Sequence, residues 1–289
     1  MKLWMIVILI ITGFIVGGCS YLFGNGGSPA PIQYGNIQVN STPVGADIFL
    51  DGNPTGYKTP YLLSDKTAGN HQIQLSYYHY QDWHQSIDIP ANDTLTIDAN
   101  LTYAPTQTMI LQPDGTEVMD TNIWSALPDQ NFEDAVSFII GHEDVNDNII
   151  RGLLQFDLTS LPGNAVITSA ELGLYYWSSG YPLISTTIGV YQVQDSWSEG
   201  TVTWKSKPNI TPTPEDTRII PDNPSFSFIF WDISDLAAQW QNSPLTTNNH
   251  GILLKDINDS MVTLRKYFYS SDYSVYNKRP KLEIDYYLR

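Results

Sequence analysis

The stretches Arg151-Gly-Leu-Leu-Gln-Phe-Asp-Leu158, Leu161-Pro-Gly163, Ala170-Glu-Leu-Gly-Leu-Tyr-Tyr-Trp177 and Trp197-Ser-Glu-Gly-Thr-Val-Thr-Trp204 decide the fold. From Leu154 to Leu158, and again from Leu172 to Tyr176, every second residue is apolar. Successive side chains of a strand point to opposite faces, so this period is typical of a strand with one buried face. The Leu161-Pro-Gly segment between them favours a turn, because proline presets φ and glycine accepts positive φ. The region therefore predicts a β-sheet.

These stretches are followed by further motifs up to the end of the chain. The further motifs are Trp231-Asp-Ile-Ser-Asp-Leu236, Gln239-Trp240, His250-Gly-Ile-Leu-Leu254 and Arg279-Pro-Lys-Leu-Glu-Ile-Asp-Tyr286. In this order they resemble the DNRLRE family, which is disaggregatase-related and is grouped with carbohydrate-binding module family 96. The resemblance covers residues 108–289. It implies a β-jelly-roll sandwich of the kind found in surface proteins and beside polysaccharide-degrading enzymes, with carbohydrate binding in some relatives.

A second resemblance lies nearer the N-terminus, in Ser41-Thr-Pro-Val-Gly-Ala-Asp-Ile-Phe-Leu-Asp-Gly-Asn-Pro-Thr-Gly-Tyr-Lys-Thr-Pro60. This segment resembles the PEGA domain, with Val44 where that family has glutamate. Residues 46–50 alternate as a strand, and Asp51-Gly52 predicts a hairpin turn. Further strands are expected at 72–76 and 86–89. The resemblance implies a small β-sandwich over residues 35–102 that serves as a spacer or an interaction domain.

The N-terminus has the pattern of an export signal. Lys2 and the apolar run from Leu3 to Val16 precede Val16-Gly-Gly-Cys19, which resembles a lipobox. Acyl chains on the Cys19 thiol would hold the protein on a membrane, since each buried methylene contributes ~0.8 kcal/mol. We expect a signal peptide over 1–18, lipidation at Cys19 and an extracytoplasmic, membrane-anchored location at the cell surface. The alternative is an ordinary signal or an uncleaved anchor helix.

The remaining segments complete an all-β organisation: a small PEGA-type β-sandwich followed by a larger jelly-roll β-sandwich. Residues 19–34 are rich in Gly, Ser and Pro and predict a flexible tether. Residues 103–107 form a short linker in which we expect limited hinge motion. In the large domain, 233–242 predicts a helix with Asp232 or Ser234 as its N-cap. Residues 252–255 and 261–269 predict a hairpin.

The amino-acid composition of the chain narrows the classes of partner that it can bind. The chain has 14 Lys and Arg against 30 Asp and Glu, a net charge of -16, which repels phosphate backbones and argues against nucleic-acid binding. Only 15 % of residues are charged, while there are 18 Tyr and 8 Trp. Aromatic and amide side chains thus replace Lys and Glu, a composition frequent in extracellular binding proteins. A polysaccharide or a cell-envelope glycan is the expected partner.

Aromatic side chains that face solvent are the candidate binding residues, because rings pack on the C–H faces of sugars. If Leu172 and Leu174 face the core, Tyr175 and Trp177 share the opposite face. The full set of candidates is Tyr175, Trp177, Tyr181, Tyr267, Tyr269 and Tyr273. The alternative is that both faces of the sheet are covered and these rings are ordinary packing. Trp197, Trp204 and Trp240 are assigned to the core.

A structural calcium ion is a further expectation, because jelly-roll binding modules often carry one. Asp144, Asn146 and Asn148 have the alternating oxygen ligands of a calcium loop, and so do Asp256, Asn258 and Ser260. Neither segment has the Gly and Glu of an EF-hand. Asp and Asn also favour turns through local hydrogen bonds, and we prefer that interpretation.

Catalytic motifs are missing from the sequence. It contains no Gly-x-Ser-x-Gly, no His-Glu-x-x-His and no phosphate-binding glycine loop. A glycosidase needs two carboxylates across a cleft, and Glu199 is the acid we consider most closely. We therefore predict a non-catalytic carbohydrate-binding or adhesion module. A structural cell-envelope protein and a polysaccharide-degrading enzyme are the alternatives.

The charge of the large domain bears on the ligand. Some relatives of this domain are associated with alginate, a polyanion. Residues 108–289 contain 23 acids and 11 bases, a net charge of -12, which opposes an anionic ligand. A basic patch of Arg265, Lys266, Lys278, Arg279 and Lys281 would compensate. A neutral glycan is equally compatible with the sequence.

Overall fold

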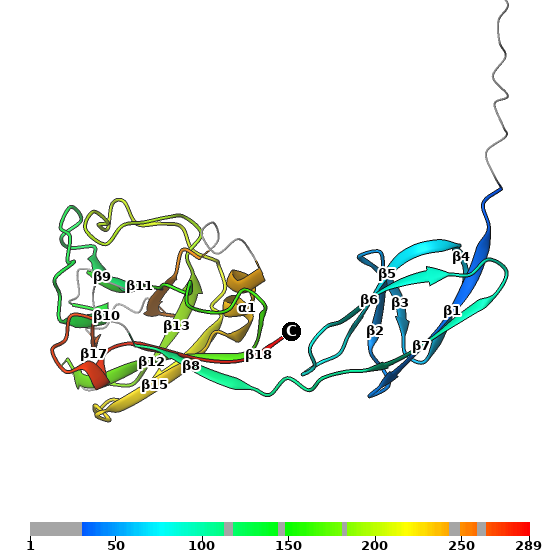
Figure 1. The fold of residues 1–289 in the computed structure, drawn as a ribbon. Helices are drawn as coiled ribbons and strands as arrows, with labels where there is room; N and C mark the ends of the chain where they lie inside the picture. The colour runs from blue at the N-terminus through cyan, green and yellow to red at the C-terminus, as the bar shows by residue number, and fades with distance from the viewer. Residues whose placement is uncertain (1–30, 113–117, 144–147, 181–183, 243–248, 259–263) are drawn as a thin grey trace, which may run out of the picture.

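The structure is a computed structural model that describes residues 31–112, 118–143, 148–180, 184–242, 249–258 and 264–289. It shows two β-domains side by side, joined by an extended connection (Figure 1). The prediction of an all-β chain is confirmed. Among the described residues, no helix has the length and apolarity needed to span a bilayer.

The small domain consists of two sheets that share one core. Its strands are β1 (Tyr34–Thr42), β2 (Asp47–Leu50), β3 (Asn53–Lys58), β4 (Tyr61–Thr67), β5 (Gly69–Ser76), β6 (Trp83–Ile89) and β7 (Thr94–Asn100). The sheet orders are β4-β1-β7 and β3-β2-β5-β6. Alternate apolar residues of both sheets meet between them, including Ile37, Val39, Ile48, Ile73 and Leu75. The alternation of β1, buried at every second residue, is what orients it.

The predicted hairpin turn at Asp51-Gly52 is confirmed. Both residues have positive φ, 52° and 77°, and Leu50 pairs with Asn53 across the turn. This is the geometry of a two-residue type I′ turn, which Asp-Gly favours. The Asp51 carboxylate also accepts hydrogen bonds from the backbone of Gln72 and binds the His71 ring at 2.7 Å. The Gln72 bond and the His71 contact lower the pKa of Asp51.

The large domain is one antiparallel sheet of 11 strands that curls around its own core. Its strands are β8 (Gln107–Leu111), β9 (Val118–Trp124), β10 (Ser137–His142), β11 (Ile149–Phe156), β12 (Ala165–Ser179), β13 (Thr186–Gln192), β14 (Asp216–Ile220), β15 (Ser227–Asp232), β16 (Ile252–Asp256), β17 (Leu264–Tyr269) and β18 (Lys281–Leu288). The order is β14-β13-β16-β11-β10-β17-β12-β18-β8, with β15 beside β12 and β9 beside β11.

The 15-residue strand β12 organises this sheet. Its first half pairs with β18, its second half pairs with β17, and β15 lies along its other edge. Leu172, Leu174 and Tyr176 point inward, with no exposed surface, and meet Trp231 and Phe268 in the main core. The inward alternation predicted for residues 172–176 is therefore confirmed.

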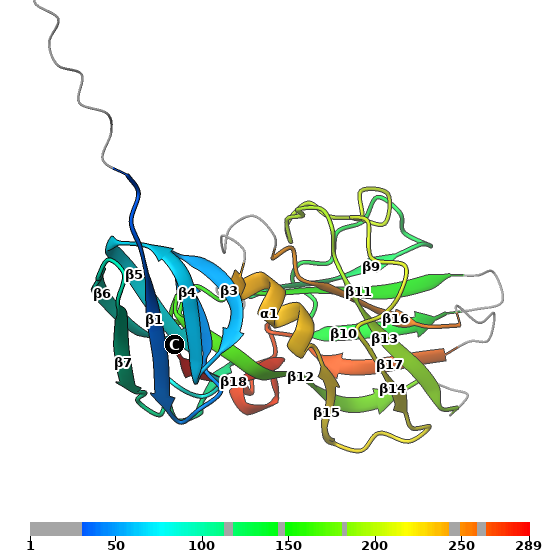
Figure 2. The same ribbon diagram turned by 90° about the vertical axis from the view of Figure 1, so that its right-hand side faces the viewer.

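One short helix, α1 (Ser234–Asn242), lies against β12 (Figure 2). The Asp232 carboxylate accepts hydrogen bonds from the backbone N–H and the hydroxyl of Ser234, so Asp232 caps the helix. Ser234 instead accepts a hydrogen bond from the backbone of Ala170 on β12. Trp240, predicted to be a core residue, is buried. A 3₁₀ helix, η1 (Tyr276–Lys278), precedes β18.

The predicted hairpin of residues 252–255 and 261–269 is wrong. Strand β16 pairs with β11 and β13, whereas β17 pairs with β10 and β12. The two strands therefore lie in different parts of the curled sheet. Both strands are apolar at alternate positions, and this pattern sets which face is buried without setting which strand lies alongside.

The connection between the domains is fixed by contacts on both sides. Tyr103 forms a β-bridge with Tyr80, and Ala104 donates a backbone hydrogen bond to His79. The His79 ring packs on Tyr287 of β18, with centroids 4.7 Å apart. The C-terminus lies between the domains (Figure 1), where Arg289 approaches Asp82 at 3.7 Å.

Candidate functional site

Aromatic side chains occupy the outer face of three neighbouring strands, β15, β12 and β17. Because Leu172, Leu174 and Tyr176 face inward, Tyr175 and Trp177 face outward. Tyr267 and Tyr269 face outward in the same way on either side of buried Phe268. Phe228 and Phe230 do so on β15, on either side of Ile229 and next to buried Trp231. We call these six residues, Tyr175, Trp177, Phe228, Phe230, Tyr267 and Tyr269, the aromatic face.

The rings form a continuous row. Phe230 contacts Phe228, with centroids 5.9 Å apart, and Phe228 meets the Tyr175 ring edge-on at 5.4 Å. Tyr175 and Trp177 each stack on Tyr269, at 5.8 Å and 5.2 Å. Trp177 then contacts Tyr267 at 5.8 Å. All six side chains are partly buried, because each covers part of its neighbours.

Tyr273, which follows β17, stacks on Tyr269 with ring centroids 3.5 Å apart and planes 11° apart. Hydrogen bonding between the two side chains, together with burial, raises the pKa of Tyr269 to about 12. The Tyr269 side chain is therefore a neutral phenol at physiological pH. Tyr273 covers one side of Tyr269, so the face is a packed surface of ring edges and partial ring faces.

Two lysines lie over this surface. The Lys278 ammonium is 5.1 Å from the Tyr175 centroid and 5.8 Å from that of Tyr269. The Lys281 ammonium is 4.3 Å from the centroid of Phe228 and binds Glu283. Such cation–π contacts contribute ~0.5–1 kcal/mol at exposed sites. The lysines add charged hydrogen-bond donors to a surface whose other polar groups are mainly the tyrosine hydroxyls.

Gly173 makes the Phe230 end of the row possible. It lies on the outer side of β12, opposite Phe230 in the ladder. A Cβ atom at this position would lie 2.9 Å from the Phe230 ring and 3.1 Å from the Lys281 side chain. Any larger residue would require the Phe230 ring to shift and would crowd the Lys281 side chain.

Phe228 and Phe230 were not among the residues predicted for the site. The signal for them is present in Ser225-Phe-Ser-Phe-Ile-Phe230, in which phenylalanine recurs at every second position. The sequence does not reveal that this segment pairs with the outer edge of β12. That pairing is what brings the two rings beside Tyr175.

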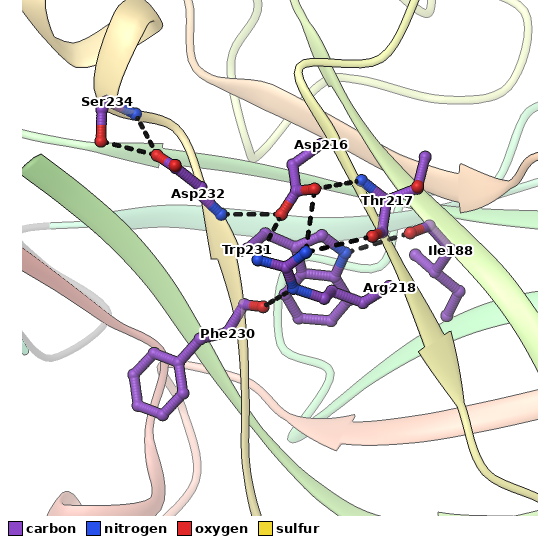
Figure 3. Close-up of polar contacts among 8 residues, drawn as sticks. All are labelled: Ile188, Asp216, Thr217, Arg218, Phe230, Trp231, Asp232 and Ser234. Carbon is purple, nitrogen blue, oxygen red and sulfur yellow. Dashed lines mark hydrogen bonds and ion pairs between the residues drawn. The ribbon is translucent and has the colours of Figure 1, made fainter.

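A polar network holds β15 in place (Figure 3). Arg218 of β14 donates a hydrogen bond of 2.7 Å to the carbonyl of Phe230, and the Asp216 carboxylate accepts one from the backbone of Asp232. Arg218 and Asp216 also pair with each other at 2.9 Å. On the inner side, the Trp231 indole donates to the carbonyl of Ile188. These side chains satisfy main-chain groups of an edge strand, which would otherwise be open to another chain.

The predicted basic patch does not form as a unit. Lys266 points into the domain, fully buried, and donates to the carbonyl of Pro221 and the hydroxyls of Tyr176 and Ser179. Burial lowers the pKa of Lys266 to about 8. Its strand position explains the error, since it lies between outward Arg265 and Tyr267. The other four lie on or beside the aromatic face: Arg265 points outward on β17, Lys278 and Lys281 lie over its rings, and Arg279 donates to the carbonyl of Tyr273.

Trp197 and Trp204, predicted to be core residues, pack on a second and smaller apolar cluster. This cluster lies on another outer face of the sheet, under residues 193–210. Both indoles are partly buried, so they are packing residues outside the main core. Arg151 and Lys207 lie over the Trp204 ring, at 5.2 Å and 4.5 Å.

Glu199 holds the segment that covers this cluster. Its carboxylate accepts a hydrogen bond from the backbone of Asp120, while Asn131 donates to the carbonyls of Glu199 and Val202. The Asp120 carboxylate is buried and accepts a hydrogen bond from the backbone of Ser271. Burial, with help from Glu199, raises the pKa of Asp120 to about 7. Both acids thus bind backbone groups, which is a structural role.

Several predicted residues lie outside the described part of the chain: Cys19, Asp144, Asn146, Tyr181 and Ser260. Asn148 is described, and its carbonyl accepts a hydrogen bond from Glu143. The Asp256 carboxylate accepts hydrogen bonds from Asn258 and Thr186, as expected of a turn residue. Within the described ranges, no three His, Cys, Asp or Glu side chains are arranged to bind a metal ion. The calcium site at 144–148 stays a prediction.

Comparison with known protein families identifies both domains. Residues 34–105 match the PEGA domain. Residues 114–286 match carbohydrate-binding module family 96. A search of curated proteins found no match to the chain.

Proposed function

Because the chain belongs to carbohydrate-binding module family 96, we propose that its large domain binds a polysaccharide through the aromatic face without cleaving it. The observation that carries the proposal is the row of six rings on β15, β12 and β17, which the described chain covers only in part. Membership of a binding-module family suggests carbohydrate as the ligand class. The face supplies the surface that such a ligand requires.

The chemistry of the face suits a sugar chain. Rings pack on the C–H groups of pyranoses, and nearby polar groups bind the hydroxyls. Lys278 supplies ammonium donors beside Tyr175, and the phenol groups of Tyr267 and Tyr269 both donate and accept hydrogen bonds. The row runs across the strands, so it favours an extended chain over a single sugar.

A non-catalytic role agrees with the placement of the acids. Glu199, the acid considered for catalysis, and its neighbour Asp120 each accept a hydrogen bond from a backbone N–H group. Glu199 belongs to the segment that covers Trp197 and Trp204, and Asp120 is hydrogen-bonded to it. As the finer description of the fold, we propose that the curled sheet is a jelly-roll sandwich, in keeping with the family resemblance.

We further propose that the protein is a cell-surface lipoprotein. In this arrangement acyl chains on Cys19 anchor the chain, residues 20–34 act as a tether, and the PEGA domain holds the large domain away from the membrane. The support is the lipobox-like Val16-Gly-Gly-Cys19 sequence. Metabolic labelling with a fatty acid should modify the wild-type protein and leave Cys19→Ser unlabelled. Equal labelling of both would contradict the anchor.

Binding to soluble polysaccharides, followed by affinity electrophoresis and calorimetry, tests the function of the face. Trp177→Ala and Tyr267→Ala should each weaken binding at least about tenfold, a loss of about 1.4 kcal/mol. Tyr34→Ala, which removes an exposed ring from the small domain, is the matched control and should bind normally. Circular dichroism should show that all three variants are folded.

Three results would contradict the proposal. Binding that survives both substitutions would place the site elsewhere on the domain. A wild-type protein that binds none of a broad panel of polysaccharides would favour a structural cell-envelope role, and release of sugar products would indicate an enzyme.

A further inference from the structure

A hollow of about 370 Å³ lies beyond one end of the aromatic face. Its lining comes from β9, β10, β11, β17 and the segment before β10, and includes Trp124, Phe132, Val136, Ile139 and Arg265. The Trp124 and Phe132 rings are 6.0 Å apart with planes 41° apart. We call it the Trp124 pocket.

The pocket continues the surface of the aromatic face. Ile139, in its lining, is the ladder partner of Tyr267, the last ring of the row. Arg265, also in the lining, points outward from β17 two residues before Tyr267. Strands β10, β17, β12 and β15 follow one another in the sheet, and β9 pairs with β11 on the far side of β10 from β17 (Figure 1). From β15 to β10 the three strand spacings amount to ~14 Å, at ~4.8 Å each.

Side chains join β9 to β10 beside the pocket and keep its shape. The Asn122 amide donates to the carbonyl of Ser137 at 2.8 Å and accepts from the backbone of Ile139 at 2.8 Å. Asn122 is buried. These bonds replace the main-chain ladder that β9 and β10 do not form, so the pocket is present before any ligand binds.

We propose that the Trp124 pocket is a subsite for one neutral sugar unit of the chain that lies on the aromatic face. This proposal rests on the carbohydrate binding proposed above. The aromatic face then binds the chain across the strands, and the pocket takes the unit that extends past β10. The size of the hollow is within the usual range of small-ligand sites, ~300–1,000 Å³.

The lining fits a neutral pyranose. Val136, Ile139 and Ile150 provide apolar contact for C–H groups, as do the two rings. Arg265 and Asp134 provide one donor group and one acceptor group. Sugar hydroxyls both donate and accept, so they can satisfy the two together.

The surrounding charge disfavours an anionic sugar. Arg265 already pairs with Glu143 at 3.3 Å. An adjoining hollow of about 460 Å³ is lined by Glu133 and Asp134. Burial and the nearby Asp134 raise the pKa of Asp272, which is a sign of crowded negative charge. A sugar carboxylate in the Trp124 pocket would meet this charge.

The test uses neutral cello-, xylo- and manno-oligosaccharides of two to six units, with alginate oligosaccharides as the anionic probe, on the full chain. Phe132→Ala removes one ring and Val136→Trp fills the mouth of the pocket. Each should weaken the binding of the longest neutral ligand about tenfold and that of the disaccharide much less. Leu127→Ala is the control, since Leu127 is exposed on the same segment and is not part of the lining.

Asp134→Asn tests the charge of the ligand, because removing this carboxylate should strengthen the binding of an anionic sugar and not that of a neutral one. A neutral sugar should bind this variant no better than the wild type, and its affinity should change little between about 0.05 and 0.5 M salt. Asp129→Asn, on the same segment and outside the lining, is the control. Tighter binding of alginate oligosaccharides by Asp134→Asn, with a steep salt dependence, would overturn the neutral assignment.

The two proposals can fail separately. If Trp177→Ala abolishes binding while Phe132→Ala and Val136→Trp do not change it, the pocket is no subsite and the aromatic face still stands. If the wild-type protein binds none of the oligosaccharides, the proposed function of the aromatic face and the proposed role of the Trp124 pocket are both contradicted.

Discussion

The large domain has two outer faces that are rich in aromatic and apolar residues, and they differ in how far the described chain covers them. On one face, Ile123, Leu153 and Leu253 are buried under residues 193–210, with Trp197 and Trp204 packed on top. On the other, the described chain covers the six rings only in part, through Tyr273 on Tyr269 and Lys278 over Tyr175. Apolar surface that the protein needs only for stability is covered by its own chain. Surface left partly open is available for a partner.

The covered face is also joined to its covering segment by side-chain hydrogen bonds. Asn131 and Asp120 bind the backbone and the carboxylate of Glu199, and the Trp197 indole donates to the carbonyl of His250. The rings of the aromatic face contact mainly one another. The comparison predicts that substitutions on the covered face change stability, while those on the aromatic face change binding.

The largest effect is expected for Leu253→Ala. Leu253 is buried between the sheet and the covering segment, and its truncation leaves a cavity. The free energy of unfolding should fall by about 2–5 kcal/mol, measured by urea denaturation. Ile219→Ala, at a residue 74 % exposed, is the control and should change it by less than about 0.5 kcal/mol. Equal losses would mean that the covered face is not a cohesive core.

The pH dependence of stability should come next. The pKa of Asp120 is about 7 in the folded chain, against an ordinary 3.8, because of burial. Between these values the folded state keeps a proton that the unfolded state has lost, so stability falls as pH rises from about 4 to about 7 and is then constant. The loss from pH 5 to pH 8 should be roughly 2–3 kcal/mol.

Asp120→Asn keeps the shape of the side chain and removes its titration. Thermal denaturation should then show a flatter pH profile than the wild type has. Glu199 and Asp272, whose pKa values are also raised by burial, will leave a smaller residual slope of the same sign. An unchanged profile would mean that Asp120 is ionised in the folded protein throughout this range.

A smaller loss is expected for Asn131→Ala. The amide donates hydrogen bonds of 2.6 Å and 2.9 Å to the carbonyls of Glu199 and Val202. Their removal should lower the free energy of unfolding by about 1–3 kcal/mol and expose residues 193–210 to proteolysis. Gln130→Ala, at the exposed neighbouring residue, should have little effect on either measurement.

The smallest effect on stability is expected for Tyr273→Ala, which removes the ring stacked on Tyr269 of the aromatic face. Without the Tyr273 hydroxyl, the pKa of Tyr269 should fall from about 12 towards the ordinary 10.0. Ultraviolet titration of the phenols measures this shift. Unfolding free energy should change by about 1 kcal/mol or less. A Tyr269 pKa that stays near 12 would show that burial, and not Tyr273, controls it.

The sequence predicts the faces of the strands better than their neighbours. Alternation places Leu172 and Leu174 inside and Tyr175 and Trp177 outside, as the structure shows. The hairpin at Asp51-Gly52 is equally local, since it depends on two residues that accept positive φ.

What the sequence could not predict depends on pairing over long distances. The hairpin of β16 and β17 was wrong because their true partners are far away in the chain. Phe228 joins the site only because β15 pairs with β12. The inward direction of Lys266 was not predicted, because the basic patch was inferred from the charges alone and not from the alternation of side chains along the strand. Carbohydrate binding and the lipid anchor stay predictions.

The pairing of β8, which follows the domain connection, with the C-terminal strand β18 has a mechanical consequence. Pulling on the small domain would load β8 along its length, and β8 pairs with β18, whose neighbour is β12. Tension applied lengthwise strains all the hydrogen bonds of such a ladder together, while a perpendicular pull would open them one at a time. The rings of Tyr175 and Trp177 sit on that same neighbouring strand. A glycan bound to these rings would therefore pull on a ladder of strands whose hydrogen bonds resist lengthwise tension together.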